Sequence, residues 1–167
     1  MAIKRILVPV DFSDDSLKAL AYARDIAKPF GAELLLLYVV EPVYYATPAD
    51  MYVTTPNMTM LLDEQRKIGT TQLRRLLTDL EKKGQRVRGM VKTGSPGQVI
   101  ADTAKSVRAD LIVIATHGRS GLAHLFMGSV SEKVVRHASC PVLTVRRGTV
   151  KVAKRKRAGR GAKKRAR

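Results

Sequence analysis

Short apolar runs alternate with helical patterns over residues 3–145, and this alternation constrains the fold more than any other feature of the chain. The runs are compact and rich in Val, Ile and Leu, which is typical of strands covered on both faces. A strand that follows a helix usually returns to the same sheet by a right-handed crossover, so this order predicts parallel pairing. We therefore expect a single-domain α/β fold with a five-stranded, parallel, doubly wound sheet of the Rossmann-like type.

The boundaries of the elements follow from caps, glycines and prolines. Ser13 is the expected cap of the first helix, and the stretch 28–31 (Lys-Pro-Phe-Gly) is expected to stop it. Ser95 and Pro96 are the expected cap and first residue of a later helix. The predicted strands cover 3–10, 33–40, 86–91, 111–115 and 141–145, and the predicted helices begin at Ser13, Leu61, Pro96 and Gly128. The third and fifth strands are expected at the sheet edges, the fifth because it is led by Pro141.

Residues 41–60 interrupt the alternation with three prolines, three tyrosines and three methionines. This partly apolar insertion has three open interpretations. It could fold over a ligand pocket as a lid, pack beside a dimer contact, or bind a partner.

The charge of the chain is concentrated at its end. The formal net charge is +17, and 12 of the 31 Lys and Arg residues lie in 146–167, a segment without Asp or Glu. We expect a domain over 1–146 followed by a basic tail over 147–167 that is disordered on its own. Such a tail is suited to the phosphates of DNA or RNA, with strong salt dependence. Anionic lipid, acidic proteins and a merely solubilising role are the alternatives.

Several classes of protein are disfavoured by what the sequence lacks. Cys140 is the only cysteine, so neither an intrachain disulfide nor a cysteine metal cluster is possible. The first apolar run is short and stops at Asp11, unlike a signal peptide, and no apolar stretch is long enough for a membrane span. A cytoplasmic location without membrane contact is the expectation.

A glycine-containing loop after the fourth predicted strand is the strongest candidate for a ligand site. The run 115–121 (Ala-Thr-His-Gly-Arg-Ser-Gly) follows that strand, and Gly128 and Ser129 then open a helical pattern. Glycines permit close backbone approach, and the N–H groups of a first helical turn attract anions. The loop therefore predicts a phosphate site. Glycines at such turns also serve geometry alone, which is the alternative interpretation.

Asp11 ends the first strand, where ligands of doubly wound sheets are bound. Its carboxylate could accept hydrogen bonds from a ribose. It could equally cap the helix that starts at Ser13 or interact with the positive end of its dipole.

These segments together resemble the universal stress protein family. The segments that carry the resemblance are 6–13, 36–40, 94–96, 115–121, 128–134 and 140–143, and they occur in order over residues 3–146. The resemblance implies a five-stranded parallel sheet of the adenine nucleotide alpha hydrolase-like type. In one branch of the family it also implies an ATP site with the pattern Gly-x2-Gly-x9-Gly-Ser/Thr.

The phosphate part of that pattern falls on residues of this loop. Gly118 matches the middle glycine, and Gly128 and Ser129 match the closing pair, with Val130 next. The opening glycine falls on Ala115, a departure that adds one methyl group and is expected to be tolerated.

The resemblance implies the rest of the site on the first and second strands. Asp11 matches the acid near the ribose and base, Pro9 and Val10 the floor of the pocket, and Val39 the position whose backbone meets adenine. Arg119 is a cation placed to reach the polyphosphate.

The chemistry of catalysis is not evident in the sequence. There is no Gly-x4-Gly-Lys-Ser/Thr loop and no spaced acid pair, and the three histidines do not form a metal set. We expect no catalytic residues and no protein metal site, and a protein that binds ATP, with magnesium, as a stress-response switch with little or no hydrolysis. The family also implies a homodimer through the edge strand 141–146. The alternative is a nucleic-acid-associated dimer that works through its basic tail, and a nucleotide-dependent enzyme is a third, weaker interpretation.

Overall fold

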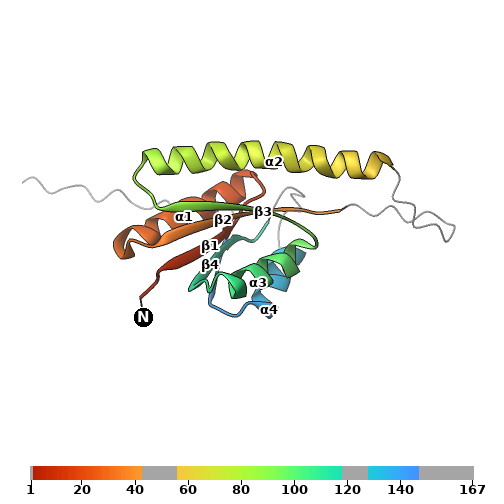
Figure 1. Cartoon of the computed structure of the whole chain (residues 1–167). Coiled ribbons are helices and arrows are strands. Elements are labelled where there is room, and N and C mark those ends of the chain that lie inside the picture. Colours follow the sequence, from red (N-terminus) through yellow and green to blue (C-terminus); the bar gives the residue numbers. More distant parts are fainter. Residues whose placement is uncertain (1, 43–55, 118–127, 147–167) are drawn as a thin grey trace, which may run out of the picture.

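The computed structural model describes residues 2–42, 56–117 and 128–146 (Figure 1). Five strands and four helices alternate in these ranges, as the sequence predicts. They are β1 (Arg5–Pro9), α1 (Asp14–Phe30), β2 (Glu33–Val40), α2 (Pro56–Lys82), β3 (Val87–Thr93), α3 (Pro96–Ser106), β4 (Leu111–Ala115), α4 (Ser129–His137) and β5 (Val142–Val145).

The strands form one sheet in the order β3-β2-β1-β4-β5, and every neighbouring pair is parallel. The expected five-stranded, parallel, doubly wound sheet is therefore confirmed, with β3 and β5 at its edges. Leu7 of β1 pairs with Leu35 of β2 on one side and with Ile112 of β4 on the other. The chain winds outward from β1 in both directions, so the winding reverses between β1 and β4, where such sheets bind ligands.

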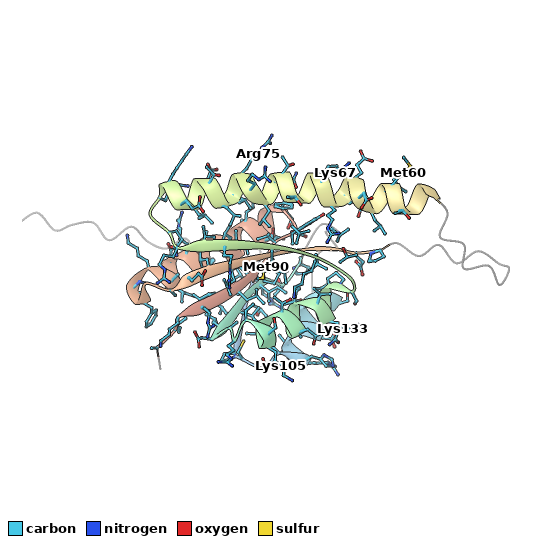
Figure 2. The ribbon with its side chains drawn as sticks, in the orientation of Figure 1. Met60, Lys67, Arg75, Met90, Lys105 and Lys133 are labelled. Carbon is cyan, nitrogen blue, oxygen red and sulfur yellow. The ribbon has the colours of Figure 1, made fainter. Side chains whose placement is uncertain are left out.

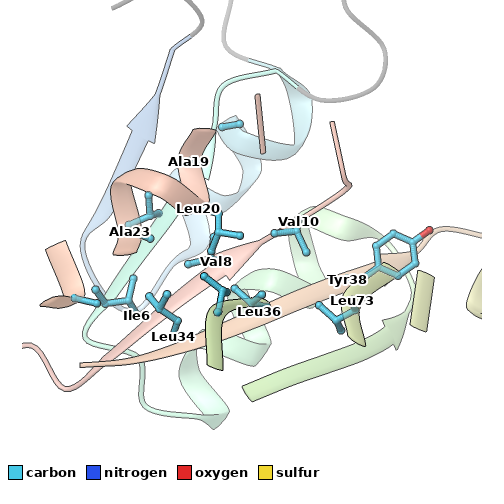
Figure 3. Packing of buried hydrophobic residues seen from close by; sticks show 14 of the residues in the cluster. Ile6, Val8, Val10, Ala19, Leu20, Ala23, Leu34, Leu36, Tyr38 and Leu73 are labelled. Atoms are coloured by element: carbon cyan, nitrogen blue, oxygen red, sulfur yellow. The ribbon is translucent and has the colours of Figure 1, made fainter. Parts of the chain in front are cut away.

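Helices cover both faces of the sheet (Figure 1). One core cluster joins the sheet to α1 and α2, and the other joins it to α3 and α4. Leu34, Leu36 and Tyr38 of β2 face the first cluster, whereas Leu35 and Leu37 face the second. Burial on both faces explains why β2 reads as a continuous apolar run. Figure 3 shows the first cluster, in which side chains of β1 and β2 meet those of α1 and α2.

The first helix ends at Phe30, inside the stretch 28–31 expected to stop it, and Gly31 in the left-handed conformation (φ 60°) is its C-cap. One helix boundary differs from the prediction. The second helix starts at Pro56 rather than Leu61, so the last five residues of the expected insertion are helical. Proline suits a first helical position because its missing N–H has no helical partner there. Residues 43–55 of the insertion lie outside the described residues, so the structure tests none of the three interpretations of the insertion.

The expected basic tail, 147–167, also lies outside the described ranges. Within those ranges, none of the helices combines the length and the apolar character that crossing a membrane requires.

Candidate functional site

The turn after β1 is held by Asp11 and Ser13. The Asp11 Oδ1 atom accepts hydrogen bonds from the Ser13 N–H (3.0 Å) and from the Ser13 hydroxyl (2.5 Å). Ser13 is the cap of α1, as expected, and its Oγ accepts from the Ser16 N–H at 3.3 Å. Asp11 thus supports the cap rather than being the cap. The same carboxylate-bearing residue also borders the cavity described below.

Phe12, between these two residues, has a backbone conformation that non-glycine residues seldom adopt. Its φ is 65°, in the left-handed region. Its ring lies 5.0 Å from the ring of Tyr38, centroid to centroid. This aromatic contact ties the β1–α1 turn to β2 and offsets part of the backbone strain.

Thr116, directly after β4, connects three elements. Its N–H donates to the Val145 carbonyl of β5 at 3.0 Å, and its carbonyl accepts from the Gly128 N–H at 2.9 Å. The Ser131 hydroxyl of α4 lies 2.8 Å from the Gly128 carbonyl and 3.3 Å from the Thr116 carbonyl. The start of α4 is therefore fixed against the end of β4, beside the end of the edge strand.

His117 follows Thr116 and is half-buried. Its Nδ1 atom lies 3.0 Å from the Thr116 hydroxyl oxygen. Its Nε2 atom is fully buried and has no hydrogen-bond partner among the described residues. Buried polar atoms are usually paired, so a buried nitrogen without a described partner is unusual.

A cavity of about 380 Å³ lies where these segments meet, at the carboxyl ends of β1, β2 and β4. Its volume is in the range of small-molecule sites. Asp11 and Glu41 are the charged side chains among the described residues that border it. The lining comprises Pro9, Val10, Asp11, Ser16, Leu37, Tyr38, Val39, Glu41, Gln65, Pro96, Ile100, Ile114, Ala115, Thr116, His117, Gly128, Ser129, Val130 and Ser131.

Eight of the ten residues proposed from the sequence border this cavity: Pro9, Val10, Asp11, Val39, Ala115, Gly128, Ser129 and Val130. The other two, Gly118 and Arg119, lie in 118–127, outside the described residues. Ser129 and Val130 are the first two residues of α4, whose N–H groups have no partner within the helix. The positive end of the α4 dipole borders the cavity with them, which suits an anion.

Sequence reasoning missed several residues of the cavity. Thr116, His117 and Pro96 lie inside segments already singled out. Thr116 and His117 follow the end of β4, and Pro96 is the first residue of α3, so their positions at the ends of elements are the signal that could have identified them. Glu41 and Gln65 belong to no motif: Glu41 directly follows β2, and Gln65 reaches the cavity only through the packing of α2 on the sheet.

Cys140 lies away from the cavity and packs against the cluster under α3 and α4. Burial raises the pKa of its thiol, and the nearby Asp110 carboxylate raises it further. The thiol therefore stays protonated at neutral pH, which favours a packing role over a nucleophilic one.

Comparison of the sequence and the fold with known proteins points to one protein family. The model of the universal stress protein family matches residues 2–146. Universal stress protein MJ0531 of Methanocaldococcus jannaschii is 36% identical over 145 residues, which cover 86% of this chain and 82% of that protein. The universal stress protein UspA of Lactobacillus plantarum has a solved structure that is 32% identical, with a TM-score of 0.77 over 87% of this chain and 99% of that one.

Two further solved structures of similar proteins contain nucleotides. A universal stress protein in complex with cAMP is 25% identical, with a TM-score of 0.60 over 87% of this chain and 98% of that chain. A universal stress protein family protein of Arabidopsis thaliana with AMP bound is 25% identical, with a TM-score of 0.58 over 87% of this chain and 93% of that chain.

Proposed function

This chain belongs to the universal stress protein family, and we propose that it binds ATP, with magnesium, in the cavity at the carboxyl ends of β1, β2 and β4. One observation carries the proposal: eight of the ten residues expected to bind ATP come from the ends of β1 and β4, from β2 and from the start of α4, and border one cavity at the reversal of the winding. The complexes of similar proteins with AMP and cAMP support an adenine nucleotide as the ligand.

Each part of the nucleotide has a counterpart in the lining. The apolar side chains of Val10 and Val39 suit the base, and the Asp11 carboxylate suits the ribose hydroxyls. Ser129 and Val130 would donate their N–H groups to the phosphates, and the Ser129 hydroxyl adds a further donor.

The fit extends to His117 and to the metal. The buried Nε2 atom of His117 would gain a partner from the ligand. Magnesium would be held mainly by the phosphates, because Mg²⁺ commonly binds through substrate phosphates and one or two carboxylates. Gly118 and Arg119 remain proposed ligands of the phosphates.

We assign the protein the role of a switch that binds the nucleotide with little or no hydrolysis. Among the described residues, no group of three or more His, Cys, Asp or Glu side chains is placed to hold a metal ion. The two carboxylates that border the cavity, those of Asp11 and Glu41, come from the ends of two different strands, β1 and β2. In this proposal, the bound nucleotide changes the shape or the assembly of the protein.

The assembly proposed is a homodimer through residues 141–146. β5 is an outer strand of the sheet, so one of its edges is available for pairing. Leu143 on β5 and Val130 and Val135 on α4 are large apolar side chains that are 38%, 36% and 47% exposed. A second copy of the chain would cover them.

Nucleic-acid association is a second candidate, favoured by the concentration of Lys and Arg in 146–167. In this case the stress-protein fold would act as a dimerising platform. Removal of 147–167 separates the two candidates: nucleotide affinity should stay unchanged, whereas any DNA or RNA binding and its salt dependence should fall sharply.

The nucleotide content of the purified protein tests the first candidate. Denaturation followed by chromatography should release near-stoichiometric ATP, or the emptied protein should bind added ATP with magnesium. Ser129→Ala should weaken that affinity by roughly 3- to 10-fold, the usual effect of one lost hydrogen bond. Ser106→Ala is the matched control, because the Ser106 hydroxyl bonds the Thr103 carbonyl within α3. Protein that holds no nucleotide and binds none would refute the proposal.

A further inference from the structure

A second cavity lies at the opposite end of the sheet from the cavity proposed for ATP, the nucleotide cavity. It has a volume of about 470 Å³ and is bordered by the end of α1 with the turn that leads to β2 (24–32) and by the turn 83–86 between α2 and β3. These turns precede β2 and β3, so the cavity is at the amino ends of the strands. The eight residues of β2 separate the two cavities by roughly 25 Å at the usual rise per strand residue. One small ligand cannot occupy both.

Four cationic side chains border this second cavity: Arg24 and Lys28 from α1, and Lys83 and Arg86 from the other turn. Asp25 is the acid that borders it among the described residues, and its carboxylate is 3.8 Å from Arg24.

The other three cations form no ion pair with a described residue. Asp79 illustrates this: it precedes Lys83 by one helical turn, yet the two are not paired.

The ends of α1 and α2 account for only part of this positive charge. Each helix ends beside the cavity, and a helix C-terminus behaves as roughly half a negative charge, which basic side chains commonly balance. Two such ends and one carboxylate offset about two of the four cations. About two positive charges remain unbalanced around the hollow.

The backbone under these cations is held in place by Gln85. Its Nε2 atom donates to the Ala32 carbonyl at 3.1 Å and to the Arg86 carbonyl at 3.3 Å, so it ties the two turns together. The Leu34 N–H of β2 also donates to the Arg86 carbonyl, at 2.9 Å. The turn after α1 and the turn 83–86 are therefore fixed relative to each other before any ligand arrives, which lowers the entropic cost of binding.

We propose that this basic cavity binds a compact, multiply charged phosphate-bearing anion. The side chains would supply the contacts, because the N–H groups of Gly31 and Gly84 already donate to the Lys28 and Glu81 carbonyls within their turns. The cations come from two segments that border one cavity, which favours a compact anion over the extended backbone of a nucleic acid. The proposal does not depend on the nucleotide cavity.

Nuclear magnetic resonance on the full-length protein tests it, with inorganic triphosphate as the probe. The amide signals of Gly31 and Gly84 report on this cavity, and that of Gly128 reports on the nucleotide cavity. We expect triphosphate to shift the first two signals to a plateau, with a weaker effect of sodium sulfate at the same ionic strength.

Charge-removing variants identify the contacts. Lys83→Gln and Arg86→Gln should each weaken the binding by about threefold or more. Lys67→Gln is the matched control: Lys67 is an exposed lysine of α2 (Figure 2), about 24 Å along the helix axis from Lys83 at the usual helical rise. Unchanged affinity in Lys67→Gln supports the proposal.

Three results would overturn it. Shifts that rise without saturation and depend only on ionic strength would mean general screening. Equal losses in Lys83→Gln and Lys67→Gln would mean that the overall charge matters and the cavity does not. A short RNA that shifts Gly31 and Gly84 when triphosphate does not would assign the surface to a nucleic acid instead.

Discussion

Gly128 shows how space, rather than backbone conformation, can require a glycine. Its φ is −61°, a value that any residue adopts. A Cβ atom at this position would lie 2.8 Å from the Thr116 carbonyl oxygen, a backbone atom that also accepts from the Gly128 N–H. The close approach that places the start of α4 beside the cavity is therefore possible only without a side chain.

Gly128→Ala should consequently destabilise the protein by about 1–3 kcal/mol, because the end of β4 and the start of α4 must move apart. ATP affinity should fall as well, since the N–H groups of Ser129 and Val130 move with the helix. Urea unfolding measures the first effect, and titration with ATP at a temperature where the variant is folded measures the second. Wild-type stability in Gly128→Ala would contradict the steric explanation.

Asp110 stabilises the start of β1 in a pH-dependent manner. Its carboxylate accepts from the Lys4 and Arg5 N–H groups, both at 2.8 Å. The hydrogen bond from Lys4 and then that from Arg5, with the charges of both residues, lower the pKa of Asp110 below 3.8 against an opposing effect of burial. Because the folded pKa is below the unfolded one, this contribution is complete above about pH 4 and is lost as the pH falls through the folded value.

Asp110→Asn should therefore be less stable than the wild type near pH 7, and the difference should shrink below pH 4. Urea unfolding of both proteins at a series of pH values measures it. A difference that is constant with pH would show that the lowered pKa of Asp110 does not contribute.

At the scale of elements, α3 and α4 pack closely through Gly97. A Cβ atom there would lie 2.8 Å from the Cβ of Lys133 on α4 and 2.9 Å from its Cδ. The Cδ atom can move away, but the Cβ atom is fixed to the helix. α4 carries two of the proposed phosphate ligands, so this contact also affects the position of the nucleotide cavity.

Gly97→Ala should destabilise the protein by roughly 1–2 kcal/mol, despite the better helix propensity of alanine. In the Gly97→Ala/Lys133→Gly variant the loss should be smaller than the sum of the two single losses, since the clashing Cβ is gone. Thermal unfolding of the four proteins gives this coupling. If the two single losses in stability simply add up in the double variant, α3 and α4 can move apart at Gly97 without a cost in free energy.

Local sequence patterns predicted most of the elements because their signals lie within the elements themselves. The apolar run of β2 and the cap at Ser13 need no knowledge of the rest of the chain. The start of α2 was predicted too late because Pro56 looked like another proline of the insertion, whereas it is the first residue of the helix.

The residues that border the nucleotide cavity also differ in whether a local sequence pattern marks them. Residues that end strands or start helices, such as Asp11 and Ser129, could be placed from the sequence. Gln65 could not, because it reaches the cavity through the packing of α2 on the sheet, and no local pattern encodes that contact.

At the scale of the whole molecule, the edge strand β5 and the nucleotide cavity are linked through Thr116. Val145 of β5 accepts from the Thr116 N–H, and the Thr116 carbonyl accepts from Gly128 at the start of α4. In a dimer formed along β5, Thr116 and Gly128 would thus connect the contact to the proposed phosphate ligands. This is the route by which the nucleotide and the assembly would influence each other.

Leu143→Lys should shift the protein from dimer to monomer, because a charge would replace an apolar side chain in the proposed contact. The matched control is Phe30→Lys: Phe30 is 52% exposed at the end of α1, next to the turn that leads into β2. Sedimentation velocity distinguishes the two states. Dissociation of both variants, or of neither, would argue against β5 as the interface.

The hydrogen bond between Thr116 and Gly128 has one further consequence. It joins the two points at which the chain leaves β4 and enters α4, 2.9 Å apart from donor to acceptor. Residues 117–127 therefore connect two positions that this hydrogen bond holds side by side. Lengthening a closed loop costs little free energy, so evolution could change the length of this stretch without rebuilding the sheet.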